Sequence, residues 1–203
     1  DFDTPIHIKE SAIEAINSGF TKYTQVDGMP DLKKAIISKF KNENRINYNA
    51  DQITVGVGGK HVIYNLLMST LNKHDEVIIP APYWVSYPDM VLLAEGKPVI
   101  VPCDSKDGFK ISPEKLSNSI SSKTKWLILN SPSNPTGACY SKNELEAIAE
   151  VVRKHKNLYV MTDDIYEYIV YDSFKFFTFA QVAPDLKERT LTVNGVSKSH
   201  CMT

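Results

Sequence analysis

The chain has 203 residues, of which 42% are hydrophobic and 23% are charged, a composition typical of a folded globular protein and not of a disordered one. Its 23 basic and 24 acidic side chains give a net charge of −1, which argues against a protein that binds nucleic acid through its phosphates. No apolar run approaches the roughly 20 residues that cross a bilayer, so a membrane partner is not expected either. The three cysteines are an odd number without C-x-x-C spacing, which excludes a disulfide framework or zinc knuckle and favours the reducing cytoplasm.

The order of the predicted elements defines the fold class. Before residue 50 the pattern is helix, loop, helix, and the second helix begins near Pro30, so residues 1–49 are predicted to be a helical lead-in segment. From residue 50 onward, short β-rich runs alternate with helical patterns, which predicts a three-layer α/β domain with a mostly parallel sheet and helices on both faces. The six predicted strands are Ile53–Val57, Glu76–Ile79, Pro98–Val101, Lys125–Asn130, Leu158–Thr162 and Thr190–Asn194.

Three of the predicted helices have clear start signals. The clearest is 141–155, where apolar residues recur at helical spacing and Ser141 with Glu144 forms a capping box. Another helix opens at Ser112-Pro113, with serine as the cap and proline in the first turn. A third follows the glycines at 58–59 and runs through Leu71.

Ligands of open α/β sheets bind beyond the carboxyl ends of the strands, so the residues there are the candidate site. Gly58-Gly59-Lys60 follows the first predicted strand and opens a helix, which suits a phosphate group. It is not a Walker A loop, because His61 follows the lysine where that loop has serine or threonine. Taken alone, this sequence is better explained as a tight turn with a solvated lysine.

The ends of the second and fourth predicted strands carry an aromatic ring and an amide. Trp84 lies in a proline-stiffened loop, where its ring could stack on a planar ligand or fill the core. Asn134 precedes Pro135 in a run of turn-forming residues, so its amide is either a ligand contact or part of a structural turn.

The last two predicted strands end in a carboxylate and an amine. Asp163 follows the fifth strand, where a buried carboxylate calls for a cationic partner such as a ligand nitrogen, although a helix cap is an alternative. Lys198 follows the sixth strand and is either a surface lysine or an amine that condenses with a carbonyl group. Taken together, the five strand ends offer what pyridoxal 5'-phosphate requires: a phosphate loop, a stacking ring, an amide donor, an anion and an amine.

Six stretches of the sequence, in this order, carry a resemblance to a known family. The chain resembles the class I aminotransferases of pyridoxal-phosphate fold type I, and in particular their bacterial aspartate/prephenate subgroup. The stretches are Tyr23-Thr24-Gln25-Val26-Asp27-Gly28, Gly58-Gly59-Lys60, Pro82-Tyr83-Trp84-Val85-Ser86-Tyr87-Pro88, Ser133-Asn134-Pro135-Thr136-Gly137, Asp163-Asp164-Ile165-Tyr166-Glu167 and Val193-Asn194-Gly195-Val196-Ser197-Lys198.

The resemblance implies a role for each of five side chains. Lys198 would join the cofactor as a Schiff base and later move the proton at the substrate α-carbon. Asp163 would pair with the pyridine nitrogen, while Tyr166 and Asn134 would donate to the ring hydroxyl oxygen. Trp84 would stack on the ring, and it would border the amino-acid substrate together with Asn134.

Three more residues complete the implied site. The backbone N–H groups of Gly59 and Lys60 would hold the phosphate, and the Lys60 amine is also a candidate for the distal carboxylate of a dicarboxylic substrate. Tyr23 resembles the tyrosine that reaches the phosphate in the neighbouring subunit, which implies a homodimer with shared active sites. No metal is implied.

The implied reaction is transfer of an amino group from aspartate to 2-oxoglutarate, with prephenate as a second candidate substrate. An aromatic or alanine aminotransferase and a non-catalytic regulatory domain that binds the cofactor are the alternatives. The family continues beyond this lysine with an arginine-containing segment and a small domain, and its opening motif starts upstream of residue 1. Residues 50–203 are therefore expected to be a truncated large domain, inactive when isolated.

Overall fold

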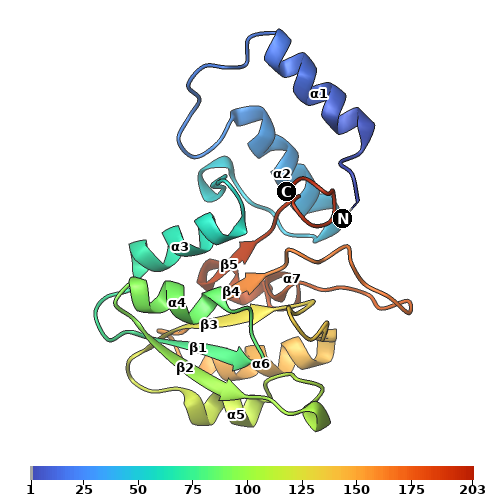
Figure 1. The fold of residues 1–203 in the computed structure, drawn as a ribbon. Helices are drawn as coiled ribbons and strands as arrows, with labels where there is room; N and C mark the ends of the chain where they lie inside the picture. Colours follow the sequence, from blue (N-terminus) through green and yellow to red (C-terminus); the bar gives the residue numbers. More distant parts are fainter. Residues whose placement is uncertain (1) are drawn as a thin grey trace.

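A computed structural model describes residues 2–203, and its centre is a five-stranded sheet (Figure 1). The strands lie in the order β2-β1-β3-β4-β5, and every neighbouring pair is parallel. This confirms the predicted α/β class. The strands are β1 (Glu76–Ala81), β2 (Lys97–Pro102), β3 (Thr124–Asn130), β4 (Tyr159–Asp163) and β5 (Thr190–Val193).

Helices cover both faces of the sheet, as predicted. The α-helices are α1 (Ile6–Asn17), α2 (Pro30–Glu43), α3 (Gly59–Thr70), α4 (Ser86–Leu93), α5 (Pro113–Ser119), α6 (Lys142–Lys154) and α7 (Phe179–Val182). Short 3-10 turns occupy Ala50–Gln52, Ser105–Asp107 and Pro184–Arg189.

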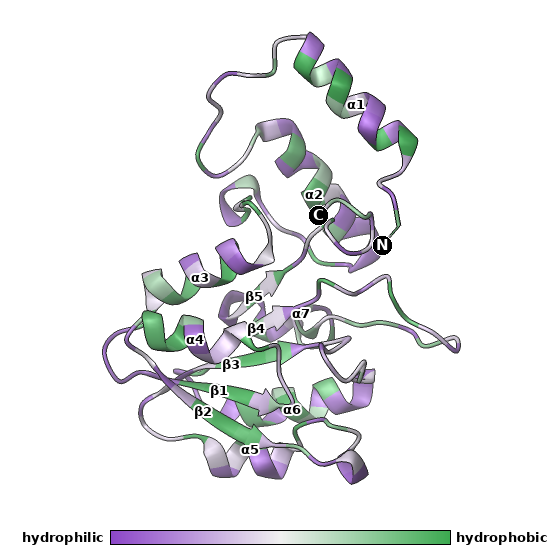
Figure 2. Ribbon diagram, viewed as in Figure 1, coloured by the Kyte–Doolittle hydropathy of each residue, from purple (hydrophilic) through white to green (hydrophobic). Residues whose placement is uncertain are grey.

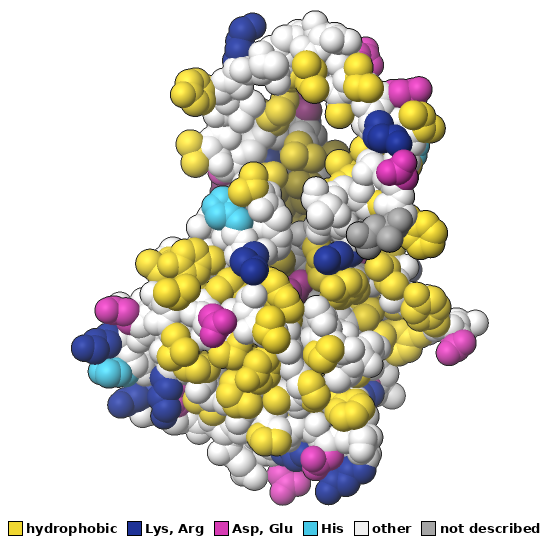
Figure 3. Space-filling view, in the orientation of Figure 1, with side chains coloured by type: hydrophobic (Ala, Val, Ile, Leu, Met, Phe, Trp, Pro, Cys, Tyr) yellow, Lys and Arg dark blue, Asp and Glu magenta, His cyan; other side chains and the backbone are white. Residues whose placement is uncertain are grey.

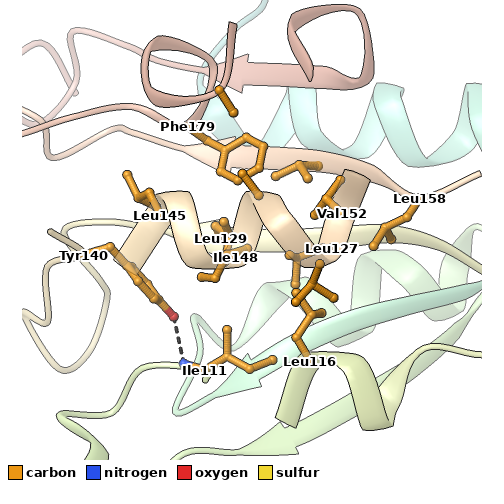
Figure 4. Packing of buried hydrophobic residues seen from close by; sticks show 14 of the residues in the cluster. Ile111, Leu116, Leu127, Leu129, Tyr140, Leu145, Ile148, Val152, Leu158 and Phe179 are labelled. Carbon is orange, nitrogen blue, oxygen red and sulfur yellow. Dashed lines mark hydrogen bonds between the residues drawn. The ribbon is translucent and has the colours of Figure 1, made fainter. Parts of the chain in front are cut away.

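Each face of the sheet has its own apolar core. On one face, side chains of α5, α6 and α7 pack with Leu127 and Leu129 of β3, and Tyr140 closes this core by accepting a 2.9 Å hydrogen bond from the Ile111 N–H (Figure 4). On the other face, α3 and α4 pack against Ile128 of the same strand. Successive side chains of β3 therefore point into opposite cores. Because both sides of this covered parallel strand are buried, its central run of residues is entirely apolar. Figure 2 shows the resulting hydrophobic strands between helices with hydrophilic outer faces.

Helices α5 and α6 begin at the predicted caps. The Ser141 hydroxyl accepts a 3.3 Å bond from the Glu144 N–H, and the Glu144 carboxylate accepts a 2.7 Å bond from the Ser141 N–H, so two otherwise free backbone donors are satisfied. The Ser112 hydroxyl likewise accepts from the Lys115 N–H at 3.1 Å. These bonds fix where each helix begins and therefore how it lies on the sheet.

One predicted strand is wrong. Residues 53–57 are extended in part but join no sheet; the single backbone bond that resembles a ladder runs from the Val55 N–H to the Asp27 carbonyl at 3.0 Å. The alternation of β-branched residues here favours an extended backbone, but a strand also needs a neighbour with free ladder groups, and this segment lies against the lead-in loop instead. The sheet therefore has five strands and not six.

The lead-in segment consists of α1, a loop and α2, as predicted. In α2 the side chains of Lys33 and Phe40 are buried, whereas no side chain of α1 is buried. Figure 1 shows α1 standing away from the sheet, and Figure 3 shows hydrophobic side chains on the surface of this part of the molecule. The boundary drawn at residue 49 stays a prediction.

Two further expectations concern the environment of the chain. Cys103, Cys139 and Cys201 are all free thiols, in keeping with the absence of a disulfide framework. Within residues 2–203, the helices are too short or too polar to span a membrane.

Candidate active site

The strand order places a switch point between β1 and β3. From β1 the chain crosses outward to β2 and then returns to lay β3 on the opposite side of β1. The connections that leave these two strands therefore run in opposite directions and open a crevice at their carboxyl ends. The segments that hold Trp84 and Asn134 begin at those ends, and Asp163 is the last residue of β4.

The beginning of α3 is open toward solvent and offers backbone donors. Gly58 caps the helix with φ +92°, a conformation that favours glycine, and a Cβ on Gly58 or Gly59 would meet no atom within 4 Å. The first intrahelical bonds run from His61 and Val62 back to the Gly58 carbonyl, so the N–H groups of Gly59 and Lys60 have no backbone acceptor within residues 2–203. Two free donors at the positive end of a twelve-residue helix suit an anion.

A chain of side-chain contacts runs from this helix to the sheet. The Lys60 amine lies 5.1 Å from the centroid of the Trp84 ring. The Trp84 ring in turn meets the Tyr87 ring edge to face, with the centroids 5.4 Å apart. Two of the predicted site residues, Lys60 and Trp84, are therefore in direct contact.

Asp163 ends this chain of contacts in a buried position. Its Oδ2 accepts a 2.7 Å hydrogen bond from the Tyr87 hydroxyl, and its Oδ1 accepts a 3.3 Å bond from the Ile165 N–H. The residue is only 6% exposed. Burial raises the pKa of the Asp163 carboxyl, and these two hydrogen bonds oppose that rise. Asp163 forms no ion pair with any residue between 2 and 203. A cationic group of a ligand placed beside this buried carboxylate would therefore form a strong electrostatic interaction with it.

Asn130 connects the Asn134 loop to the backbone of Asp163. Its Nδ2 donates to the Asp163 carbonyl at 2.8 Å, and its Oδ1 accepts from the Asn134 N–H at 2.8 Å. The Asn134 loop and the segment containing Tyr166 line one cavity of about 620 Å³, together with apolar side chains that include Ile169 and Phe174. The cavity is large enough for a small planar ligand or substrate.

Lys198 lies on the turn that follows β5. It is exposed, and its amine forms no hydrogen bond or ion pair within residues 2–203. The turn is fixed by close packing at Gly195, where an added Cβ would lie 2.7 Å from the Cδ1 of Ile165. The lysine turn and the turn after Asp163 are therefore neighbours.

Tyr23 stands apart from the other predicted site residues. Its side chain is fully exposed and contacts none of the other predicted residues. The prediction that it serves a neighbouring subunit is untested by a single chain.

Sequence reasoning missed the side chains that hold the site together. Tyr87 and Asn130 were given no role, although both are polar or aromatic residues adjoining a strand end. The Asn194 amide nitrogen was also overlooked; it is buried and lacks a hydrogen-bond partner within residues 2–203. The position of all three residues near strand ends could have marked them as candidates. The direction in which their side chains point depends on the packing of distant elements and could not be predicted from the sequence.

The fold and the edge just described define a class of protein: an α/β domain whose parallel strands are followed by a helix start with free N–H groups, a partly buried tryptophan, a buried aspartate and an exposed lysine. The sequence profile of the family "Aminotransferase class I and II" matches residues 1–203. The chain belongs to this family.

Similar proteins are bacterial aminotransferases. The chain is 65% identical to a probable aspartate/prephenate aminotransferase of Rickettsia bellii and 58% identical to the aspartate/prephenate aminotransferase of Cereibacter sphaeroides; each match covers the whole chain and 51% of the relative. The crystal structure of the aspartate aminotransferase from Rhizobium meliloti superimposes with a TM-score of 0.99 at 53% identity, over the whole chain and 51% of that structure. The chain thus spans about half the length of these relatives.

Proposed function

We propose that the full-length protein is a pyridoxal-phosphate-dependent transaminase that moves the amino group of aspartate to 2-oxoglutarate and accepts prephenate as a second oxo acid. In this proposal, residues 50–203 belong to its cofactor-binding large domain. The observation that carries the proposal is Asp163, a buried carboxylate without an ion-pair partner within residues 2–203, linked through Tyr87 to Trp84 and adjoined by the turn that packs against the Lys198 turn.

The residues at this edge fit the cofactor in three respects. The free N–H groups of Gly59 and Lys60 suit a phosphate, and the space beside Gly58 and Gly59 is open. The Trp84 ring, which is only partly buried, offers a face for stacking. The Asp163 carboxylate suits a protonated ring nitrogen, since that cation supplies the charge partner that residues 2–203 do not.

When bound, pyridoxal phosphate supplies an electron sink for the bond to the substrate α-hydrogen. Asp163 would keep the ring nitrogen protonated and so hold that sink at full strength. The Lys198 amine would hold the cofactor aldehyde and would move the proton at the substrate α-carbon. Tyr166 and Asn134 would donate to the ring oxygen and orient the ring.

The acidic substrates are matched by a positive charge. The Lys60 amine, held over the Trp84 ring, would pair with the distal carboxylate of aspartate or 2-oxoglutarate. The proteins named for aspartate or for aspartate and prephenate are 44 to 65% identical, and the aromatic aminotransferase of Pyrococcus horikoshii is 42% identical, with a TM-score of 0.96. The relatives that are 51 to 65% identical are named for aspartate or for aspartate and prephenate, which favours aspartate over an aromatic or alanine donor.

A homodimer with shared sites is the assembly we propose. Its support is the apolar surface of α1 and the loop after it, which this chain does not cover: the exposed side chains include Ile13, Ile16, Phe20, Tyr23 and Val26. Light scattering of the full-length protein should give the mass of a dimer, and a monomer that retains full activity would contradict shared sites. The predicted location in the cytoplasm stays a prediction.

The deciding experiment adds pyridoxal phosphate to the full-length protein and follows 2-oxoglutarate-dependent consumption of aspartate, phenylalanine and alanine, and amination of prephenate. We expect aspartate to be used best. Lys198→Ala should abolish both turnover and visible absorption of the lysine-bound cofactor, while Lys142→Ala, which removes another exposed lysine, should leave both intact. Binding without turnover in the unaltered protein would instead support a regulatory domain.

A further inference from the structure

The turn after β4 buries two carboxylates that the proposed reaction does not use. Asp164 is 2% exposed and the Glu167 side chain is 4% exposed. Both lie within four residues of Asp163, and Tyr166 sits between them in the sequence. Because isolated buried charge is costly, these acids need a structural reason to be there.

Glu167 has its partners on the lead-in helix. One carboxylate oxygen forms an ion pair with Lys39 of α2, and the other accepts a 3.1 Å hydrogen bond from the Asn44 Nδ2 just after that helix. The Lys39 amine also donates to the Asn44 Oδ1 at 2.7 Å. The three side chains therefore form a closed triangle that joins α2 to the turn.

Tyr168 makes a second connection between the same two elements. Its hydroxyl donates to the Glu43 carboxylate at the end of α2, and the Lys39 amine lies 5.5 Å from the centroid of its ring. The other side of Tyr168 meets the His200 ring edge to face, with the centroids 6.0 Å apart. His200 is two residues beyond Lys198, so this contact reaches the lysine turn as well.

Tyr166 lies next to these anchored residues but has no side-chain anchor of its own. Its hydroxyl makes no hydrogen bond within residues 2–203, and the turn is closed around it by backbone bonds, from Glu167 N–H to the Asp164 carbonyl at 3.0 Å and from Ile169 N–H to the Tyr166 carbonyl at 2.8 Å. The position of the Tyr166 ring is thus set by the backbone, and the backbone is set by what holds Glu167 and Tyr168.

We propose that Glu167 and Tyr168 are positioning residues: held by Lys39, Asn44 and Glu43 of the α2 end, they set where the Tyr166 hydroxyl stands in the cofactor site. The lead-in helix then serves the active site directly. This inference rests on the proposed function, because it takes Tyr166 as a donor to the cofactor ring oxygen.

The consequence is measurable in the colour of the bound cofactor. A donor to the ring oxygen stabilises the negative charge that this oxygen carries after the lysine-bound cofactor loses its proton. Displacing Tyr166 removes that stabilisation, so the pH midpoint of the visible absorption change should rise. General loosening of the fold would lower the unfolding temperature without moving this midpoint in a set direction.

The test compares Glu167→Gln, Lys39→Gln and the double variant in the full-length protein loaded with pyridoxal phosphate. Each single variant should raise the midpoint by about one pH unit, and the double variant should raise it no further, because both changes break the same pair. Lys39→Arg, which keeps the charge, should return the midpoint toward that of the unaltered protein. Lower kcat with unchanged KM for aspartate should accompany each shift.

Asp185→Asn is the matched control, since Asp185 pairs with Arg153 away from this turn. Its midpoint should stay that of the unaltered protein. If Glu167→Gln does not fold, Tyr168→Phe carries the test, because it deletes one hydroxyl from a half-exposed side chain. If the pH midpoint of the visible absorption change is the same in the folded variants as in the unaltered protein, the inference is overturned. If the unaltered protein shows no visible absorption with pyridoxal phosphate, the proposed function is overturned instead.

Discussion

The hydroxyl of Tyr87, near the start of α4, donates a 2.7 Å hydrogen bond to the Asp163 carboxylate at the end of β4. Tyr87 is 2% exposed, and burial followed by the nearby Asp163 charge raises its pKa well above the usual value. The phenol therefore stays neutral and can act only as a donor toward the carboxylate. This bond links the first turn of α4 to β4, which lies two positions from β1 in the sheet.

Tyr87→Phe tests the importance of this bond. Removing a buried donor to a charged acceptor costs about 1.5–3 kcal/mol and should raise the Asp163 pKa further. The variant should bind pyridoxal phosphate about tenfold or more weakly at pH 7, as measured by titration of visible absorption in the full-length protein. The loss should shrink at higher pH, where Asp163 ionises in the variant too; equal affinity at pH 7 in both proteins would contradict this role.

Gly195→Ala tests the close packing between the lysine turn and the turn after β4. The new Cβ would lie 2.7 Å from the Ile165 Cδ1, so either the Ile165 side chain or one of the two turns must shift. We expect formation of the lysine-bound cofactor to slow by roughly tenfold, because small displacements of a reacting group are costly. Stopped-flow absorption measures this rate.

The companion variant for this prediction is Ile165→Val, which removes the atom that the new Cβ meets. The pair Gly195→Ala with Ile165→Val should recover most of the lost rate, while Ile165→Val alone should change it little. A double variant as slow as Gly195→Ala would show that the glycine matters for some reason other than this contact.

The main elements were readable from the sequence because their signals are local. The capping box at Ser141 and Glu144 and the serine–proline start at 112–113 place their helices to within a residue of the structure. Residues 53–57 show the limit of this reasoning. Their alternating pattern is that of a strand, but strand formation also depends on a partner, and no local pattern says which segment will lie alongside.

The candidate site also contains residues that the sequence pattern predicts and residues that it does not. Asp163, Trp84 and the lysine turn were found because parallel strands end at one edge, and topology alone then brings their residues near one another. The side chains that hold them were not found: Tyr87 reaches Asp163 across the sheet, and Glu167 is held by Lys39 from a helix 128 residues earlier. Such contacts depend on how distant elements pack, which sequence spacing does not encode.

Ser141→Ala tests the α6 capping box. The variant loses the hydroxyl that accepts from the Glu144 N–H, and loss of such a cap costs about 1 kcal/mol of the free energy of unfolding. Because α6 contributes Leu145, Ile148 and Val152 to the core, the loss should appear as a lower denaturant midpoint for the whole domain. Ser141→Asp, which can still accept the bond, should restore most of the loss; equal midpoints for alanine and aspartate would contradict a capping role.

Asp164 should make stability fall as pH rises. Burial raises its pKa well above the model-peptide value of 3.8, the nearby Glu167 and Asp163 charges add to the rise, and the neighbouring Thr178 side chain and the Lys39 charge oppose it. The folded protein therefore holds this proton more tightly than the unfolded chain, so the contribution of Asp164 is fully present below pH 3.8 and is lost as pH rises through the folded-state pKa. Asp164→Asn removes this dependence.

As pH rises from 4 to 8, the free energy of unfolding of Asp164→Asn should therefore increase relative to that of the unaltered protein. Urea titrations of the two full-length proteins at each pH measure this difference. Asp185→Asn is a control of opposite sign, because a hydrogen bond from Arg153 lowers the Asp185 pKa and its contribution is lost as pH falls. That variant should be the less stable one at neutral pH and should approach the unaltered protein in acid. A pH-independent difference for Asp164→Asn would mean that the acid is ionised in the fold, with Lys39 or another group compensating its charge.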